Sequence, residues 1–258
     1  MKHSFIDQYS DLDSFIHKLD PRTKFITSLT FIVLVVLTPI RNWQAFALYF
    51  CLIATCLAIS KLPPLYVLKR SLVIFPFVLV IAIFIPFFKP GEVVGSYNIW
   101  LWQISVTYDG LLVLANVVTK AWLCILSLIL LSATTKFTNL LKGLKQLGMP
   151  KVIVLILSFM YRYIFVLVDE VMRMRQARDS RNFGGGRLRQ LKTIGNMIGT
   201  LFIRSYERGE RIYAAMLARG FDGEIRSLHQ LNFKRVDAYF SVAFGLVLIS
   251  SVIISWQL

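Results

Sequence analysis

Long uncharged, apolar runs divide this chain. Four of them contain no Asp, Glu, Lys or Arg, at residues 25–40, 42–60, 71–88 and 238–258. A fifth run, 110–135, contains a single charge, Lys120. A helix that crosses a bilayer needs roughly 20 mostly apolar residues. The pattern therefore predicts an all-α, polytopic membrane protein of about five transmembrane helices.

A sixth apolar run, residues 152–168, carries Arg162 at its centre and leads into Asp169 and Glu170. If it crossed the membrane, residues 173–235 would lie outside the cell, yet that segment has 14 Lys and Arg against five acidic residues. Basic segments stay on the cytoplasmic side. We therefore expect this run to lie tilted at the cytoplasmic face or to re-enter, with the N-terminus cytoplasmic; six spans is the alternative.

Composition supports a membrane location. Of 258 residues, 56% are apolar and only 17% are charged, and the formal net charge is +15. Soluble domains carry roughly 25% charged residues. The apolar content excludes a disordered chain or a nucleic-acid-binding tail. The positive charge suits an anionic membrane surface, an acidic substrate or an acidic protein partner.

The segments between the runs have patterns of their own. Residues 89–109 alternate partly and predict an outer hairpin or short strand pair. Residues 138–147 predict an amphipathic helix ended by Gly148 and Pro150. Residues 169–226 mix apolar and basic positions and predict two or three amphipathic helices. We expect three regions: four membrane helices in 1–136, a cytoplasmic or interfacial coupling region in 137–235, and a last membrane helix in 236–258.

A short pattern occurs twice, 38 residues apart. Arg181-Asn182-Phe183-Gly184-Gly185 matches Arg219-Gly220-Phe221-Asp222-Gly223. Asn and Gly tolerate the left-handed conformation that ends a helix, so each copy predicts a helix whose last turn presents an arginine. Glu207 and Arg211 form an i,i+4 pair that favours helix through Gly209. Either the arginines only compensate their helix dipoles, or they dock in two equivalent grooves of a partner.

At these residues the sequence resembles the T component of energy-coupling factor (ECF) transporters, the membrane scaffold of bacterial vitamin and metal-ion importers. Ala218-Arg219-Gly220 matches the second of the family's two Ala-Arg-Gly motifs, and Ser180-Arg181-Asn182 keeps only the arginine of the first. Residues 19–25 are similar to the family's lead-in to the first span. Residues 5–7, 207–211 and 215–223 look most like the cobalt-type (CbiQ-like) member.

The resemblance implies a non-catalytic subunit of the bacterial cell membrane. It would link a membrane-embedded, substrate-binding S component to two ATP-binding-cassette ATPases, with a small accessory membrane subunit as a further partner and no nucleic acid. Arg181 and Arg219 would dock in the two ATPases, which would bind ATP and Mg²⁺. Cobalt uptake is the expected task, and nickel or a vitamin is the alternative. The transported metal would be bound by the S component.

Absent motifs agree with this role. Gly184-Gly185-Gly186-Arg187 lacks the Lys-Ser/Thr end of a phosphate-binding loop, and no His, Cys and carboxylate cluster has metal-ligand spacing. We therefore expect no cofactor in this chain, and we expect His3 and His17 to be solvated. Lys120, inside a span, either snorkels to the membrane interface or contacts the S component.

Two other functions compete with the scaffold. An intramembrane enzyme would need an activating His or carboxylate beside a nucleophile. The predicted spans contain Ser and Thr, but no His and no carboxylate. A self-sufficient carrier would show inverted repeats and broken, charge-bearing helices within its spans, whereas the repeat lies in the basic segment between them.

Overall fold

The computed structural model describes residues 9–10, 12–39, 42–88, 93–99, 102–181, 186–223 and 233–256. The chain divides into two units. We call residues 4–143 with 231–258 the bundle unit, and residues 1–3 with 144–230 the arm unit. Each is described by itself.

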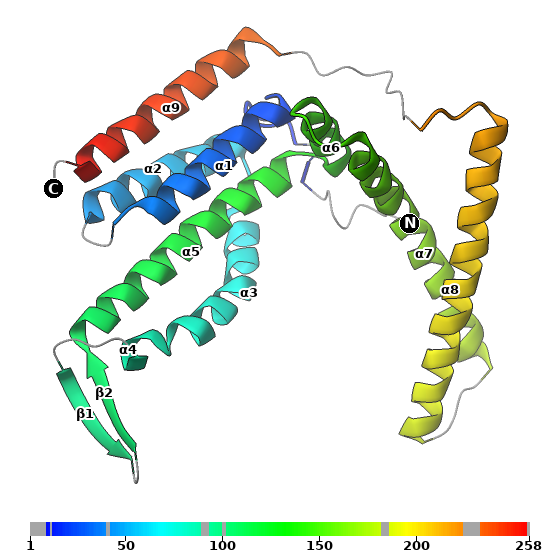
Figure 1. The fold of residues 1–258 in the computed structure, drawn as a ribbon, viewed down its shortest axis with the longest axis horizontal. Coiled ribbons are helices and arrows are strands. Elements are labelled where there is room, and N and C mark those ends of the chain that lie inside the picture. The colour runs from blue at the N-terminus through cyan, green and yellow to red at the C-terminus, as the bar shows by residue number, and fades with distance from the viewer. Residues whose placement is uncertain are drawn as a thin grey trace. The chain divides into compact units, whose positions relative to one another are not determined.

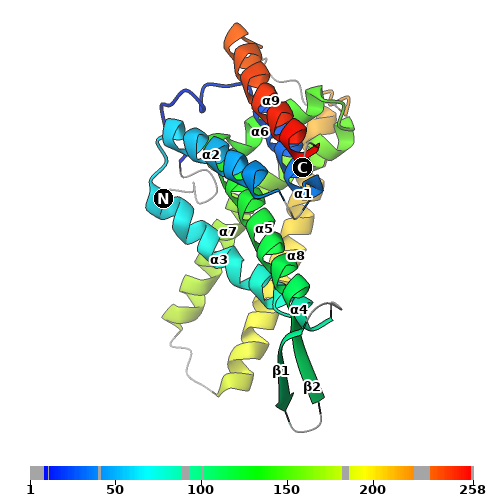
Figure 2. The ribbon, with the colours of Figure 1, turned by 90° about the vertical axis from the view of Figure 1, so that its left-hand side faces the viewer.

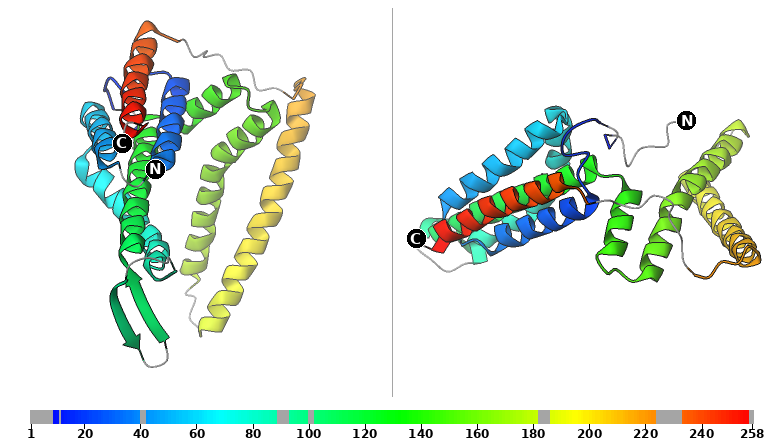
Figure 3. Two further views of the ribbon diagram at one scale, coloured as in Figure 1. Left: turned by 60° about the vertical axis from the view of Figure 1, so that its left-hand side comes forward. Right: turned by 90° about the horizontal axis from the view of Figure 1, so that it is seen from above.

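The bundle unit is built around one long helix. In chain order its elements are α1 (Pro21–Leu37), α2 (Trp43–Ser60), α3 (Pro64–Ala82), α4 (Ile85–Phe88), β1 (Val93–Ile99), β2 (Trp102–Thr107), α5 (Tyr108–Thr134) and α9 (Arg235–Trp256). Helix α5 contacts α1, α2, α3 and α4, and α9 lies along α1 and α2 (Figures 1 and 3). The last helix therefore packs against the first two.

The core of the bundle unit combines large apolar side chains with a chain of hydroxyl groups. Phe31, Tyr49 and Leu123 are each at most 1% exposed. The Tyr49 hydroxyl lies 3.1 Å from Thr38 Oγ1 and accepts a 3.0 Å hydrogen bond from Ser251 Oγ. These bonds satisfy buried polar groups and join α2 to α9 and to the residue that follows α1. They fix which faces of these helices meet.

The predicted strand pair at 89–109 is confirmed. Strands β1 and β2 are antiparallel, with Val93 opposite Thr107 and Ile99 opposite Trp102, and β2 leads directly into α5 (Figure 2). Thr107 Oγ1 donates to Pro86 O at 3.1 Å. A Cβ on Gly110 would lie 2.6 Å from Pro86 Cα, so α4 approaches the first turn of α5 as closely as only a glycine permits.

The predicted all-α polytopic class is confirmed for the described residues, with this hairpin as the addition. Four helices are long and apolar enough to cross a membrane: α2, α5, α7 (Lys151–Ser180) and residues Arg235–Ile253 of α9. Two further predicted spans fall on α1, which has 17 residues, and on α3 with α4. We expected residues 152–168, which form the first part of α7, not to cross the membrane fully. The length and apolar composition of α7 suit a span, so that expectation rests on loop charge alone.

The arm unit consists mainly of two long helices, α7 and α8 (Arg187–Ala218). Helix α7 runs without a break from the apolar run into the basic segment, whereas in the sequence we treated residues 152–168 and 169–226 as separate segments. No Gly or Pro interrupts residues 151–180, so nothing in the sequence ends the helix there. The two or three helices predicted for 169–226 are thus the last part of α7, from residue 169, and all of α8.

Helix α6 (Phe137–Gln146) connects the two units and has the predicted extent and end. Gly148 has φ 98°, and the Met149 and Gly148 amides donate to Leu144 O at 3.1 Å and Lys145 O at 3.3 Å. This pair of bonds is the Schellman ending of a helix. Leu141 is 2% exposed, so one face of the amphipathic helix is packed.

Candidate partner-docking site

Arg219 occupies the end of α8 in the geometry that the repeat predicted. It is the C-cap residue, exposed, and Gly220 follows with φ 75°. The Gly220 amide donates to Leu217 O at 3.0 Å, and the Phe221 amide donates to Met216 O at 3.1 Å. These two bonds form a Schellman ending that requires the left-handed residue at Gly220. The backbone of Arg219 is thereby fixed at the C-terminal end of α8.

Phe221 folds back onto the arm unit. It is half-buried and, with Met216, lines an apolar groove of about 420 Å³ between α7 and α8. Phe159 and Tyr163 of α7 form the opposite side, and Arg208 is the charged residue at the groove. The predicted packed Phe is confirmed for this copy. Ala218 of the predicted docking motif is the last residue of α8, and the supporting residue Gly223 has φ 85°.

Arg181 occupies the same position at the end of α7. It is an exposed C-cap residue with φ −83° and ψ 15°, against −95° and 11° for Arg219. Ser180 Oγ donates to Ala177 O at 3.1 Å. Asn182, Phe183 and Gly185 lie outside the described residues. The equal backbone conformation at the two arginines confirms that both stand at helix ends.

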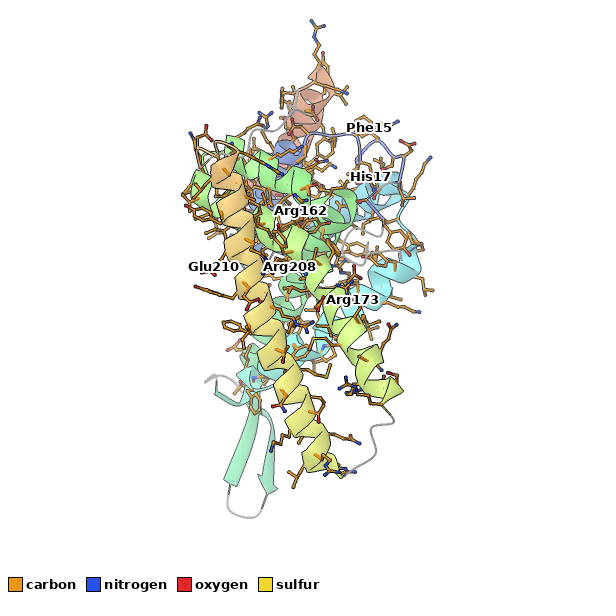
Figure 4. The ribbon with its side chains drawn as sticks, turned by 90° about the vertical axis from the view of Figure 1, so that its right-hand side faces the viewer. Phe15, His17, Arg162, Arg173, Arg208 and Glu210 are labelled. Carbon is orange, nitrogen blue, oxygen red and sulfur yellow. The ribbon has the colours of Figure 1, made fainter. Side chains whose placement is uncertain are left out.

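Ion pairs shape the helices that carry these arginines. Glu207 Oε2 lies 3.9 Å from Arg211 Nη1, and α8 continues through Gly209 as predicted. Glu170 of α7 binds Arg204 of α8 and Arg173 of its own helix, each at 2.7 Å. Its side chain is 15% exposed. Figure 4 shows the two helices side by side, with Arg162 and Arg173 on α7 and Arg208 on α8.

The Glu170 contact was missed in the sequence. In the sequence we noted Glu170 only as an acidic residue that follows the apolar run 152–168. Both of its oxygens instead bind arginines three residues and 34 residues later. The i,i+3 spacing to Arg173 is a signal that could have been read.

Lys120 has a partner in its own chain. Its Nζ donates at 2.8 Å to the carbonyl of Val36, in the last turn of α1. The last carbonyls of a helix have no partner within it and carry partial negative charge. Lys120 thus caps α1 from α5, which neither of the two predicted roles included.

A buried charged cluster of the bundle unit was also missed. Asp20, Lys24 and Asp237 are 5%, 6% and 2% exposed. In the sequence, Asp20 is noticed only as one of residues 19–25, which are similar to the family's lead-in. Asp237 is noticed only as the residue before the uncharged run 238–258. A separation of 217 residues between Asp20 and Asp237 leaves no periodic signal.

His17 is half-buried, contrary to the prediction that it is solvated. Its Nε2 donates to Tyr9 O at 3.0 Å, and its Nδ1 lies 2.6 Å from Ser14 Oγ. Burial lowers the pKa of His17 below its ordinary value of 6.5, which favours the neutral imidazole. In the neutral ring, Nδ1 accepts from the Ser14 hydroxyl. His3 lies outside the described residues.

Comparison with known proteins places these features in a family. The cobalt transport protein family, CbiQ, matches residues 13–231. The energy-coupling factor transporter transmembrane protein EcfT of Ruminiclostridium cellulolyticum is 31% identical over 90% of this chain and 90% of its own. The chain belongs to the CbiQ family of ECF transporter T components. The resemblance seen in the sequence is thereby confirmed.

Other relatives of this CbiQ-family chain agree over most of its length. The EcfT protein of Leuconostoc gelidum is 29% identical over 99% of both chains. An uncharacterized protein of Methanocaldococcus jannaschii, MJ1571, is 31% identical over 92% of this chain and 81% of its own. The chain is therefore a multi-pass membrane component of a transporter. Among the described residues, no three His, Cys, Asp or Glu side chains are grouped as metal ligands.

Proposed function

We propose that this CbiQ-family chain is the non-catalytic scaffold of an ATP-driven importer of the cell membrane. It links two ATP-binding-cassette ATPases to a membrane-embedded S component, with a small accessory membrane subunit as a further partner. The ATPases bind ATP and Mg²⁺, and the S component binds the transported ion. Co²⁺ is the proposed solute, supported by the family's description, with nickel or a vitamin as the alternative.

The observation that carries the proposal is the equivalent placement of Arg181 and Arg219. Each is an exposed C-cap at the end of a helix of at least 30 residues. A guanidinium offers five donors in a fixed plane, which suits a groove of carboxylates or carbonyls on a partner. Two such ends on one chain suit two copies of the same ATPase. ATP-driven closure of the ATPase pair then moves the two helix ends.

The basic arm is proposed to lie in the cytoplasm, with the N-terminus. Its apolar side chains are exposed along both helices, among them Ile156 at 58%, Phe202 at 71% and Leu217 at 51%. Exposed apolar side chains along a helix are typical of a surface that another protein or the membrane covers. We assign it to the S component, since that partner is itself a membrane protein and offers apolar helix surfaces.

The test is purification of the complex from the native host's membranes with the Arg181→Glu/Arg219→Glu double variant. The reversed charges should abolish co-purification of the ATPases, because truncating or reversing a desolvated charge contact costs about 2–5 kcal/mol. Arg189→Glu, an equal charge change at an exposed position near the start of α8, is the matched control and should retain them.

Two outcomes would contradict the proposal. Retention of the ATPases by the double variant would reduce the arginines to helix caps. A wild-type chain that purifies alone and moves Co²⁺ in liposomes without ATPases would be a self-sufficient carrier. The membrane protein that co-purifies with wild type identifies the S component, and loading it with Co²⁺, Ni²⁺ or a vitamin decides the solute.

A further inference from the structure

One buried carboxylate in the bundle unit holds the beginnings of two helices. Asp237, in the first turn of α9, accepts the Lys234 amide on Oδ2 and the Asp20 amide on Oδ1, both at 2.8 Å. Lys234 and Asp20 immediately precede α9 and α1. Backbone amides ahead of a helix are unpaired unless a side chain accepts them. Asp237 therefore joins the N-terminal ends of the first and last helices.

Lys24 adds the end of a third helix to this cluster. Its Nζ donates to Thr134 O, the last residue of α5, at 2.9 Å, and to His17 O at 3.2 Å. Its charge is attracted by the carboxylates of Asp237 and Asp20. A cation at the carbonyl end of a helix is favourable, and here it is also almost fully enclosed. We call Asp20, Lys24 and Asp237, with the three helix ends they hold, the anchor.

The anchor lies at both connections between the bundle unit and the arm unit. The chain leaves the bundle unit from the end of α5 through α6, and it returns ahead of α9. Helix α6 packs on the same place, because a Cβ on Gly143 would lie 3.4 Å from the backbone of Arg22 and 3.5 Å from Pro21. Both connections to the arm are thus fixed on the first turn of α1.

We propose that Asp237 and Lys24 are positioning residues that transmit displacement of the arm into the membrane helices. This inference rests on the function proposed above. Asp237 and Lys24 are buried charges that bind backbone groups at the ends of α1, α5 and α9. Removing either one leaves buried backbone groups without a partner, so these contacts resist being opened. Pulling on either connection therefore moves α5 and α9 as whole helices instead of unravelling their ends.

The first test is independent of any partner. In the full chain in nanodiscs, Asp237→Asn should raise the hydrogen-exchange rates of the Asp20 and Lys234 amides at least about ten-fold, because the neutral amide group offers one acceptor where the carboxylate offers two. Asp13→Asn is the control, since Asp13 pairs with Lys18 at 3.5 Å on the surface. A double variant, Lys24→Met/Asp237→Asn, is measured as well. If the amides of Asp20 and Lys234 exchange as slowly in both variants as in wild type, the anchor does not exist.

The second test uses the complex with its ATPases and S component. Spin labels replace Tyr239 of α9, 75% exposed, and Leu111 of α5, 53% exposed, in a chain whose three cysteines are changed to alanine. We expect wild type and Asp13→Asn to change the label distance when ATP is added. Asp237→Asn should bind the ATPases equally and lose the change.

Two results separate the anchor from the scaffold function. If the ATPases do not assemble on wild type, the proposed function fails. If they assemble and Asp237→Asn shows the same ATP-driven distance change as wild type, or wild type shows none, the positioning role is overturned and the scaffold function stands.

Discussion

The two units of this chain differ in how much of their apolar surface is buried within the unit. The bundle unit has a contiguous core in which Phe31 and Val35 are fully buried, supported by buried hydroxyl and charge contacts. In the arm unit, α8 buries no residue and α7 buries only Val154. The arm therefore owes its shape to helix propensity, helix endings and the Glu170 ion pairs. Many apolar side chains of α7 and α8 are therefore exposed in the chain by itself.

The largest expected difference between the two units comes from truncating one Phe in each. Phe31→Ala removes a fully buried ring in contact with Tyr49 and Phe244, and should cost about 3–5 kcal/mol of stability. Phe202→Ala removes a ring that is 71% exposed and should leave the melting temperature within about 2 °C of wild type. Thermal unfolding of the detergent-solubilised chain measures both. An equal loss for the two would show that the arm has a core of its own.

Replacing one glycine by alanine in each unit should change stability by a smaller amount, but with opposite signs. Gly110→Ala places a Cβ 2.6 Å from Pro86 Cα and should be destabilising, since backbone has to shift to accommodate it. Gly199→Ala, in the interior of α8 with nothing within 4 Å, should stabilise that helix by up to about 1 kcal/mol. Circular dichroism on heating distinguishes the signs. A stabilising Gly110→Ala would mean that α4 does not rest against α5.

The smallest effect is the pH response of the lead segment. Burial favours the neutral imidazole of His17, whose pKa is lowered below 6.5. The segment's stability is therefore complete above pH 6.5 and declines as pH falls from 6.5 through the folded-state pKa. Limited proteolysis near residues 9–18 should accelerate at pH 5.5 relative to pH 7.5. His17→Gln should lose that dependence, and a wild-type chain equally resistant at both pH values would contradict it.

Local chemistry explains which features the sequence predicted. The uncharged runs, the strand pair, the end of α6 and the helix-end positions of Arg181 and Arg219 follow from neighbours a few residues apart. The continuity of α7 was missed because a change of composition at residue 168 is not a change of conformation. Asp237, Lys24 and Lys120 each also have a partner 84 to 217 residues away, and no local pattern encodes such contacts.

The return of α9 to α1 and α2 also has a consequence for biosynthesis. Asp20 and Lys24 are synthesised more than 200 residues before Asp237. The bundle therefore waits, during translation, for the whole arm to be made before its first and last helices meet. A chain stopped before residue 235 would lack the carboxylate that accepts the Asp20 amide and the helix that covers α1 and α2.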